Sequence, residues 1–68
     1  MEITKETEIR EGKQQNMLGY MLDYEYYCSW DILKENIRAN GDSVALFLDK
    51  IDQCKTVGDI NDLVSEYI

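Results

Sequence analysis

The residues of this chain that could do chemistry are mainly carboxylates, because the sequence has fourteen acidic residues, two cysteines and no histidine. Histidine titrates nearest neutral pH and is the commonest general base, so its absence excludes Ser-His and Cys-His nucleophilic schemes. Asp59 and Asp62 share one predicted helix face and could do acid–base work together. Such a pair needs a cleft that a small bundle rarely encloses, so we interpret both as solvated acids. The sequence therefore predicts a protein that is not an enzyme and has no catalytic residues.

Neither a metal site nor a cofactor site is indicated by the spacing of potential ligands. Cys28 and Cys54 lie far apart, with no second cysteine or histidine near either, so the spacing of zinc ligands is missing. The segment from Asp49 fails the calcium-loop pattern, because Ile51 occupies its third, ligand-bearing position. The glycines occur singly, without the clustering that lets backbone amides cradle phosphate. We expect no metal and no cofactor, and we expect the two cysteines to be free thiols.

The charge balance indicates what kind of partner the protein binds. Fourteen acids against seven bases give a net charge of −7, which repels nucleic acid and anionic membrane alike. The longest uncharged stretch, Gln14 to Leu22, is far shorter than a membrane span, and the first residues lack the pattern of a secretory signal. We therefore expect a cytoplasmic protein that binds a protein partner with a basic surface, without direct contact to nucleic acid or membrane.

Carboxylates recur along two predicted helices. Asp59, Asp62 and Glu66 line the outer side of the last helix, and Asp49 and Asp52 lie one turn apart on the helix before it. Like charges at this spacing repel by only tenths of a kcal/mol, so the fold tolerates them easily. One interpretation is a solvated face that keeps the protein in solution. The other is an acidic stripe that docks on arginine and lysine side chains of a partner.

Aromatic residues are concentrated in one segment, because five of the seven in the chain lie between Tyr20 and Trp30. A small core cannot bury all of them. We expect Tyr20, Tyr24 and Trp30 to point inward, which leaves Tyr26 and Tyr27 outside. Exposed tyrosine is typical of binding hot spots. The alternative is that the rings cover the junction between two helices while their hydroxyl groups remain in contact with water.

Four short helices are expected to position these residues. The first starts at Gln14 and presents one apolar face, which runs through Met17, Tyr20, Met21, Tyr24 and Cys28. The second runs from Trp30 to Ala39, between an N-cap serine at Ser29 and a stop at Asn40-Gly41.

The third helix is capped by Asp42 or Ser43, and its apolar stripe consists of Val44, Phe47, Leu48, Ile51 and Cys54. The fourth begins with a capping box of Thr56 and Asp59 and buries Ile60, Leu63, Val64 and Tyr67.

These elements predict an all-α fold, a small helical bundle of three to four short helices with an extended or frayed N-terminal segment. The chain of 68 residues is expected to form a single domain, with a polar N-terminal arm at 1–13 and a helical core at 14–68. The alternative is an α+β fold. Hydrophobic residues between Leu18 and Tyr26 also alternate, so that segment could pair with Ile3 to Arg10 as a β-hairpin.

The function that fits these features is a non-enzymatic acidic protein-binding module, an inhibitor or antagonist that docks on the basic surface of a nucleic-acid-binding protein or nuclease. In size and charge alone it is similar to phage-encoded inhibitors such as anti-CRISPR proteins, to nuclease immunity proteins and to antitoxins. The alternative is a structural or assembly subunit that homo-oligomerises, or docks in a larger complex, through apolar and aromatic surface. The candidate partner-binding residues are Asp23, Glu25, Tyr26, Tyr27, Asp49, Asp52, Asp59, Asp62 and Glu66.

Overall fold

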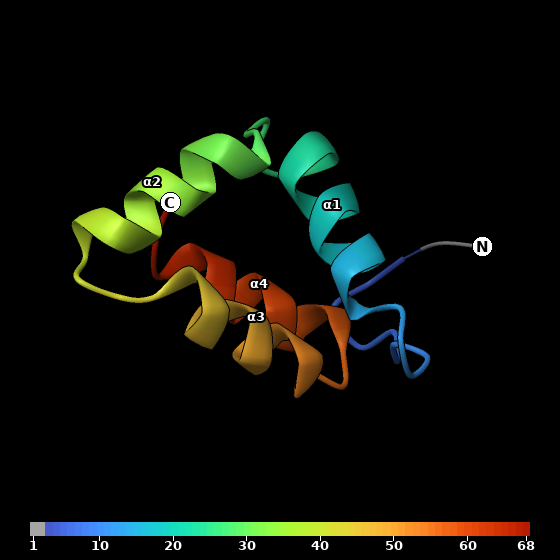
Figure 1. Cartoon of the computed structure of the whole chain (residues 1–68). Helices are drawn as coiled ribbons and strands as arrows, with labels where there is room; N and C mark the ends of the chain where they lie inside the picture. The colour runs from blue at the N-terminus through green and yellow to red at the C-terminus, as the bar shows by residue number, and fades with distance from the viewer. Residues whose placement is uncertain (1–2) are drawn as a thin grey trace.

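Four helices account for most of the chain that the computed structural model describes, residues 3–68. They are α1 (Gln14–Tyr24), α2 (Trp30–Ala39), α3 (Val44–Asp52) and α4 (Val57–Ser65), joined by short connections (Figure 1). The predicted all-α bundle is confirmed, while the first two residues of the predicted arm lie outside the described residues. No helix in this range has the length and apolar content to cross a membrane.

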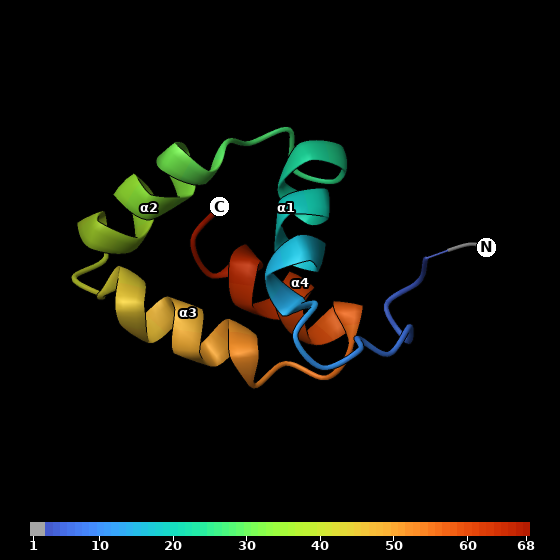
Figure 2. The same cartoon turned by 45° about the vertical axis from the view of Figure 1, so that its right-hand side comes forward.

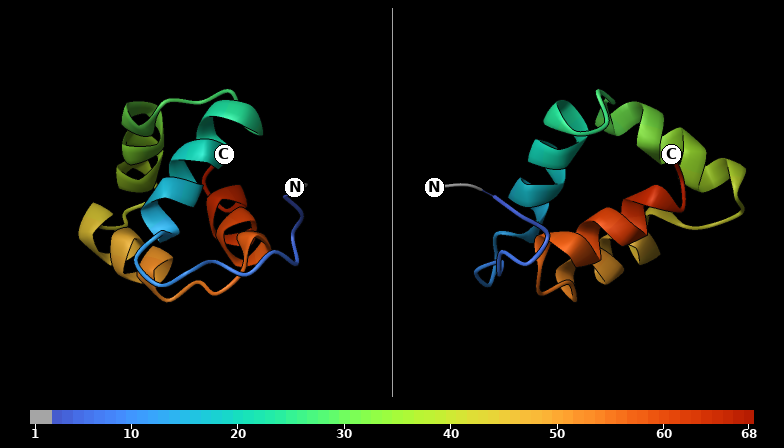
Figure 3. Two further views of the ribbon diagram at one scale, coloured as in Figure 1. Left: turned by 90° about the vertical axis from the view of Figure 1, so that its right-hand side faces the viewer. Right: turned by 180° about the vertical axis from the view of Figure 1, so that it is seen from behind.

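The helices are arranged so that α1 packs on both α3 and α4, while α2 packs on α3. In Figure 2, α1, α2 and α3 frame the near side of the molecule and α4 lies behind them. Seen from behind, in the right panel of Figure 3, α4 crosses in front of α3. The last helix is therefore the element against which α1 and the N-terminal segment are placed.

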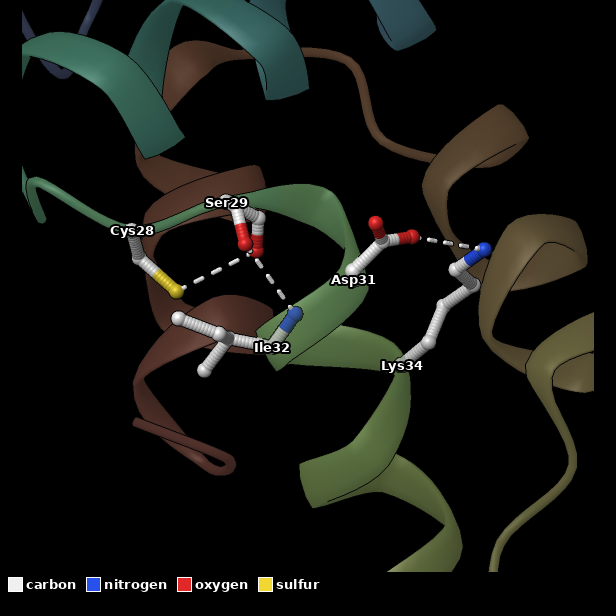
Figure 4. Close-up of polar contacts among 5 residues, drawn as sticks. All are labelled: Cys28, Ser29, Asp31, Ile32 and Lys34. Carbon is white, nitrogen blue, oxygen red and sulfur yellow. Dashed lines mark hydrogen bonds and ion pairs between the residues drawn. The ribbon is translucent and has the colours of Figure 1, made fainter.

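The ends of α2 and α3 are set by local capping. Ser29 Oγ accepts a hydrogen bond from the Ile32 amide at 3.2 Å, as Figure 4 shows, and Ser43 Oγ accepts from the Leu46 amide at 3.2 Å. Each cap satisfies an amide that the helix cannot, and a serine there stabilises a helix by about 1 kcal/mol. Gly41, at φ +81°, takes the left-handed conformation that ends α2. The helix predicted from Trp30 to Ala39 is thus confirmed at both ends.

A single hydrophobic cluster joins the four helices. At its centre Phe47 is 1% exposed, with its ring centroid 6.0 Å from that of Trp30 and 5.6 Å from that of Tyr67. The stripe predicted for α3 faces this cluster, with Val44 and Leu48 half-buried at its edges. The buried members of the cluster are Leu18, Met21, Leu22, Leu33, Ile37, Phe47, Ile51, Cys54, Val57, Ile60, Val64 and Tyr67.

Tyr67 fixes the end of the chain to α2 and to the turn that follows it. Its hydroxyl donates to Asp42 Oδ2 at 2.6 Å, and its carbonyl accepts from Asn36 Nδ2 at 2.9 Å. The bond to the Asp42 carboxylate, together with burial, raises the pKa of Tyr67 to about 12. The C-terminal residues are thereby held across the open side of the cluster.

The N-terminal arm lies against the start of α4 and makes turns at residues 5–6 and 11–12. Its backbone accepts hydrogen bonds from the Val57 amide at Thr7 O (3.0 Å) and from the Gly58 amide at Lys5 O (2.9 Å). The Ile9 amide donates to Lys55 O at 2.8 Å, beside an isolated antiparallel bridge between residues 8 and 56. The arm therefore pairs with the α3–α4 connection, and the alternative of a hairpin with residues 18–26 is wrong because those residues belong largely to α1.

Replacement of Gly58 by alanine should loosen the arm. A Cβ atom at this position would lie 2.9 Å from the backbone oxygen of Lys5, so the arm would have to move and the bond from the Gly58 amide would weaken. We expect Gly58→Ala to lower the free energy of unfolding by about 1 to 2 kcal/mol, the net contribution of one or two hydrogen bonds. Denaturant unfolding measures this loss, and amide exchange at Val57 locates it.

The matched control is Gly19→Ala, since nothing lies within 4 Å of a Cβ placed at Gly19. That change should stabilise the protein because alanine is the better helix former. Equal effects at the two glycines would contradict the close contact between the arm and α4.

Truncation of Phe47 tests the centre of the core. The ring is buried between two other aromatic rings, so Phe47→Ala leaves a cavity that the surrounding helices cannot fill. Such changes cost about 3 to 5 kcal/mol, which is most of the stability of so small a domain. We expect loss of cooperative thermal unfolding by circular dichroism, and an unchanged midpoint would show that the core lies elsewhere.

Candidate functional site

The orientation of α1 differs from the one predicted. Leu18, Met21 and Leu22 face the core, whereas Tyr20 is 37% exposed and Tyr24 67% exposed. The two tyrosine rings stack on each other with their centroids 4.9 Å apart. Leucine and methionine have no polar atom that needs a partner, so they displace tyrosine from a core with room for one face only. The prediction that these tyrosines point inward is therefore wrong, and α1 presents them on its outer side.

Tyr26 also differs from its predicted position outside the fold, because it is half-buried and joins the loop after α1 to α4. Its hydroxyl donates to Asn61 Oδ1 and lies 3.0 Å from Ser65 Oγ. Both partners are on α4, more than thirty residues further along the chain. With its polar atom occupied in this way, Tyr26 contributes to the packing of the fold.

Tyr27 stands in the loop after α1, 89% exposed and at φ +50°. Within residues 3–68 it is the one residue other than glycine with a positive φ. The loop holds this geometry through a bond from the Cys28 amide to Leu22 O at 2.8 Å. For an L-residue the left-handed conformation costs roughly 1 to 2 kcal/mol, and an exposed ring recovers none of it by packing. Strain of this kind at an exposed side chain is typical of functional positions.

These exposed side chains form a surface that we call the tyrosine face: Tyr20, Asp23, Tyr24, Glu25 and Tyr27. Tyr20 and Glu25 also line a cavity of about 170 Å³ between α1, the arm and α4. Tyrosine rings offer area for apolar and cation–π contact, and carboxylates beside them can pair with a guanidinium group. The tyrosine face thus has the chemistry to receive arginine side chains from a partner.

The predicted acids on α3 and α4 are distributed as expected on outer faces, but not all of them have free carboxylates. Asp49, Asp52, Asp62 and Glu66 are exposed. Within residues 3–68 a single ion pair is present, between Lys34 Nζ and Asp31 at 3.2 Å (Figure 4). The negative charge on α3 and α4 is therefore not neutralised by ion pairs inside the described fold.

Asp59 has a structural task at the start of α4. Its Oδ2 atom accepts from the Lys55 amide at 3.0 Å and from the Thr56 amide at 3.1 Å, while its own amide donates to Thr56 Oγ1 at 3.2 Å. This is the predicted capping box, completed by aspartate in place of glutamate. The bonds from the Lys55 and Thr56 amides lower the pKa of Asp59 below its ordinary value of 3.8. We therefore leave Asp59 out of the surface offered to a partner.

The capping box makes stability depend on acidic pH. A carboxyl group with a lowered pKa in the folded state contributes stability that is present above its unfolded pKa and is lost as pH falls through the folded value. We expect the melting temperature to fall as pH drops below about 4, and to fall less steeply in Asp59→Asn. Thermal unfolding from pH 6 to pH 2 by circular dichroism checks this, with Asp62→Asn as control. Parallel curves for all three proteins would show that the cap does not depend on the charge of Asp59.

Both cysteines are free, as expected. Cys54 is buried and donates from Sγ to Lys50 O at 3.3 Å, and burial, followed by the charge of Asp59, raises its thiol pKa. Cys28 is half-buried beside the α2 cap (Figure 4). Across the described range no three potential metal-ligating side chains of histidine, cysteine, aspartate or glutamate come together.

No protein-family model, no curated protein and no solved structure matches this chain. The interpretation of the site therefore depends on its own geometry. Sequence reasoning missed Tyr20 and Tyr24 as surface residues. The signal was present in their neighbours, because Leu18 and Leu22 offer a more apolar face at the same helical spacing.

Proposed function

We propose that this protein is a non-enzymatic acidic module that binds a protein partner through the basic surface of that partner. The observation that carries the proposal is the tyrosine face, where three exposed tyrosines and the exposed Asp23 and Glu25 lie close together in sequence and two of the rings stack. Tyrosine is enriched at hot spots because it adds large contact area at a small cost in conformational entropy. The strained backbone of Tyr27 supports the same conclusion, since it holds an aromatic ring away from the fold.

The charge of the chain supports a basic partner. The net charge is −7, and the exposed acids of α3 and α4 add to the field around the tyrosine face. A field of one sign raises the rate of encounter with a surface of the opposite sign and suppresses association with acidic proteins. Proteins that bind nucleic acid carry such basic surfaces for phosphate groups. An inhibitor or antagonist of a nucleic-acid-binding protein or nuclease, of the type encoded by phages and mobile elements, is the role we favour.

We place this activity in the cytoplasm. The two free thiols support this assignment, because small extracellular domains of this size usually depend on disulfides.

A second candidate is an assembly subunit that associates with copies of itself or docks in a larger complex. It is favoured by exposed apolar side chains away from the tyrosine face, at Ile32 on α2 and Leu46 on α3. Salt distinguishes the two functions, because electrostatic docking weakens steeply as ionic strength rises whereas apolar association holds. Sedimentation of the isolated protein at low and high salt, followed by binding measurements with a partner, separates them.

Replacement of Tyr27 by asparagine should separate folding from binding. Asparagine tolerates the left-handed conformation, and the tyrosine ring makes little contact with the fold, so Tyr27→Asn should melt at or above the temperature of the wild type. Loss of a hot-spot ring costs about 2 kcal/mol or more, so the affinity for the partner should fall about thirtyfold. Capture from a lysate of the source organism identifies the partner, and titration with the purified partner measures the affinity.

The control is Glu35→Gln, which removes an exposed charge on α2 outside the tyrosine face. It should bind nearly as tightly as the wild type. A Tyr27→Asn protein that folds and binds with unchanged affinity would show that the tyrosine face is not the docking surface.

A further inference from the structure

A second surface lies on α1 next to the tyrosine face, with Asp23 between the two. It is a cavity of about 240 Å³ lined by residues of α1, the start of α2 and α3, the three helices whose arrangement Figure 2 shows. We call it the α1–α3 groove. Its volume is below the roughly 300 to 1,000 Å³ of ordinary small-molecule sites, so it suits an inserted side chain better than a cofactor. The residues that line it are Gln15, Leu18, Gly19, Leu22, Trp30 and Leu48.

Gly19 lies in the wall of the groove and has no evident role in folding. It lies in the middle of α1, where glycine is less favourable than any residue except proline. Its backbone does not have the positive φ that would require glycine, and no atom lies within 4 Å of a Cβ placed there. Gly58 is the opposite case, because the arm occupies that space. What a bare position in a helix does provide is close approach for another molecule.

Exposed carboxylates follow the lining residues of the groove along α1 and α3. Leu48 is followed on α3 by the exposed acids Asp49 and Asp52, and Gly19 shares its side of α1 with the exposed Asp23 one turn later. The cation on the opposite rim is Lys34, whose Nζ lies 5.8 Å from the centroid of the Trp30 ring and is paired with Asp31. The lining of the groove is therefore uncharged, and the exposed residues that directly follow Leu22 and Leu48 are the acids Asp23 and Asp49.

An uncharged lining next to exposed acids is complementary to an amphipathic helix with basic residues on its polar face. Residues 3–68 offer no strand edge to which an extended peptide could add. A helix laid between α1 and α3 would set its apolar side against the half-buried Trp30 and Leu48, since Leu18 and Leu22 are already covered by the core.

We infer that the α1–α3 groove binds a basic amphipathic helix of the protein partner, with one large apolar side chain of that helix seated against Gly19. The lysine and arginine residues of the helix face Asp23, Asp49 and Asp52. This inference rests on the proposed function and specifies the segment of the partner that docks.

Trp30 provides a direct probe, because it lines the groove and is the one tryptophan of the chain. The ligand is a synthetic tryptophan-free peptide with leucine at i, i+3, i+4 and i+7 and lysine or arginine elsewhere. Its control is a scrambled peptide of the same composition. Titration should shift the Trp30 emission saturably to shorter wavelength with the amphipathic peptide, and the scrambled peptide should bind at least tenfold more weakly. Absence of a saturable change, or equal affinity for both peptides, would overturn the inference.

Gly19→Gln tests the wall of the groove. Glutamine is a good helix former that fills the space beside Gly19, so the free protein should melt roughly 3 to 5 °C higher while peptide affinity falls at least tenfold. If Gly19 had only a structural role, its replacement would not raise the melting temperature while lowering the affinity for the peptide. Asn16→Gln, at an exposed position of the same helix outside the groove, is the matched control and should leave the affinity unchanged.

Fluorescence anisotropy of a labelled peptide separates failure of the groove from failure of the proposed function. Peptide affinity that survives Gly19→Gln but is lost in Tyr27→Asn would place the peptide on the tyrosine face. That result would overturn the groove and leave the proposed function standing. If both Gly19→Gln and Tyr27→Asn capture the partner as well as the wild type does, that result would count against the proposed function itself, independently of the peptide measurements.

Discussion

The start of α4 imposes the constraint on which the rest of the structure depends. The first amides of a helix have no partner within it, and in this fold each of the first three is satisfied from a different place. Val57 donates to Thr7, Gly58 to Lys5 and Asp59 to the side chain of Thr56. Those bonds tie the arm to α4, and the arm leads directly into α1. The start of α4 therefore helps to place α1 over α3 and α4.

The parts of this fold that sequence predicts are those with a local cause. Ser29 and Gly41 bracket α2, and Thr56 marks the start of α4, because each acts on amides or carbonyls a few residues away. The side of α1 that faces inward has no such cause. It depends on Leu18, Met21 and Leu22 filling the core in place of Tyr20 and Tyr24, and the distant Asn61 and Ser65 then receive the hydroxyl of Tyr26. The arm is also beyond sequence reasoning, because its bonds to α4 use main-chain atoms common to every residue.

Helix α1 has three sides with different surroundings. The inner side of α1 fills the core, one flank carries the stacked tyrosines, and the other flank borders the α1–α3 groove. Two of its features oppose stability, the glycine in its middle and the left-handed tyrosine beyond its end. The exposed acids add mutual repulsion, which a basic partner would relieve on binding. These three features lower the stability of the isolated protein.

The attachment of the arm has a consequence for how this sequence can change through evolution. The carbonyl groups of Lys5 and Thr7 make the contact, and the side chain of Lys5 is exposed, so selection for folding places few demands on that side chain, whereas Ile9 packs against the core. The residue at position 58 is strongly constrained, because any side chain larger than that of glycine would clash with the backbone of Lys5. Relatives of this protein should therefore vary at the position of Lys5 and keep glycine at the second position of α4, although the two residues contact each other.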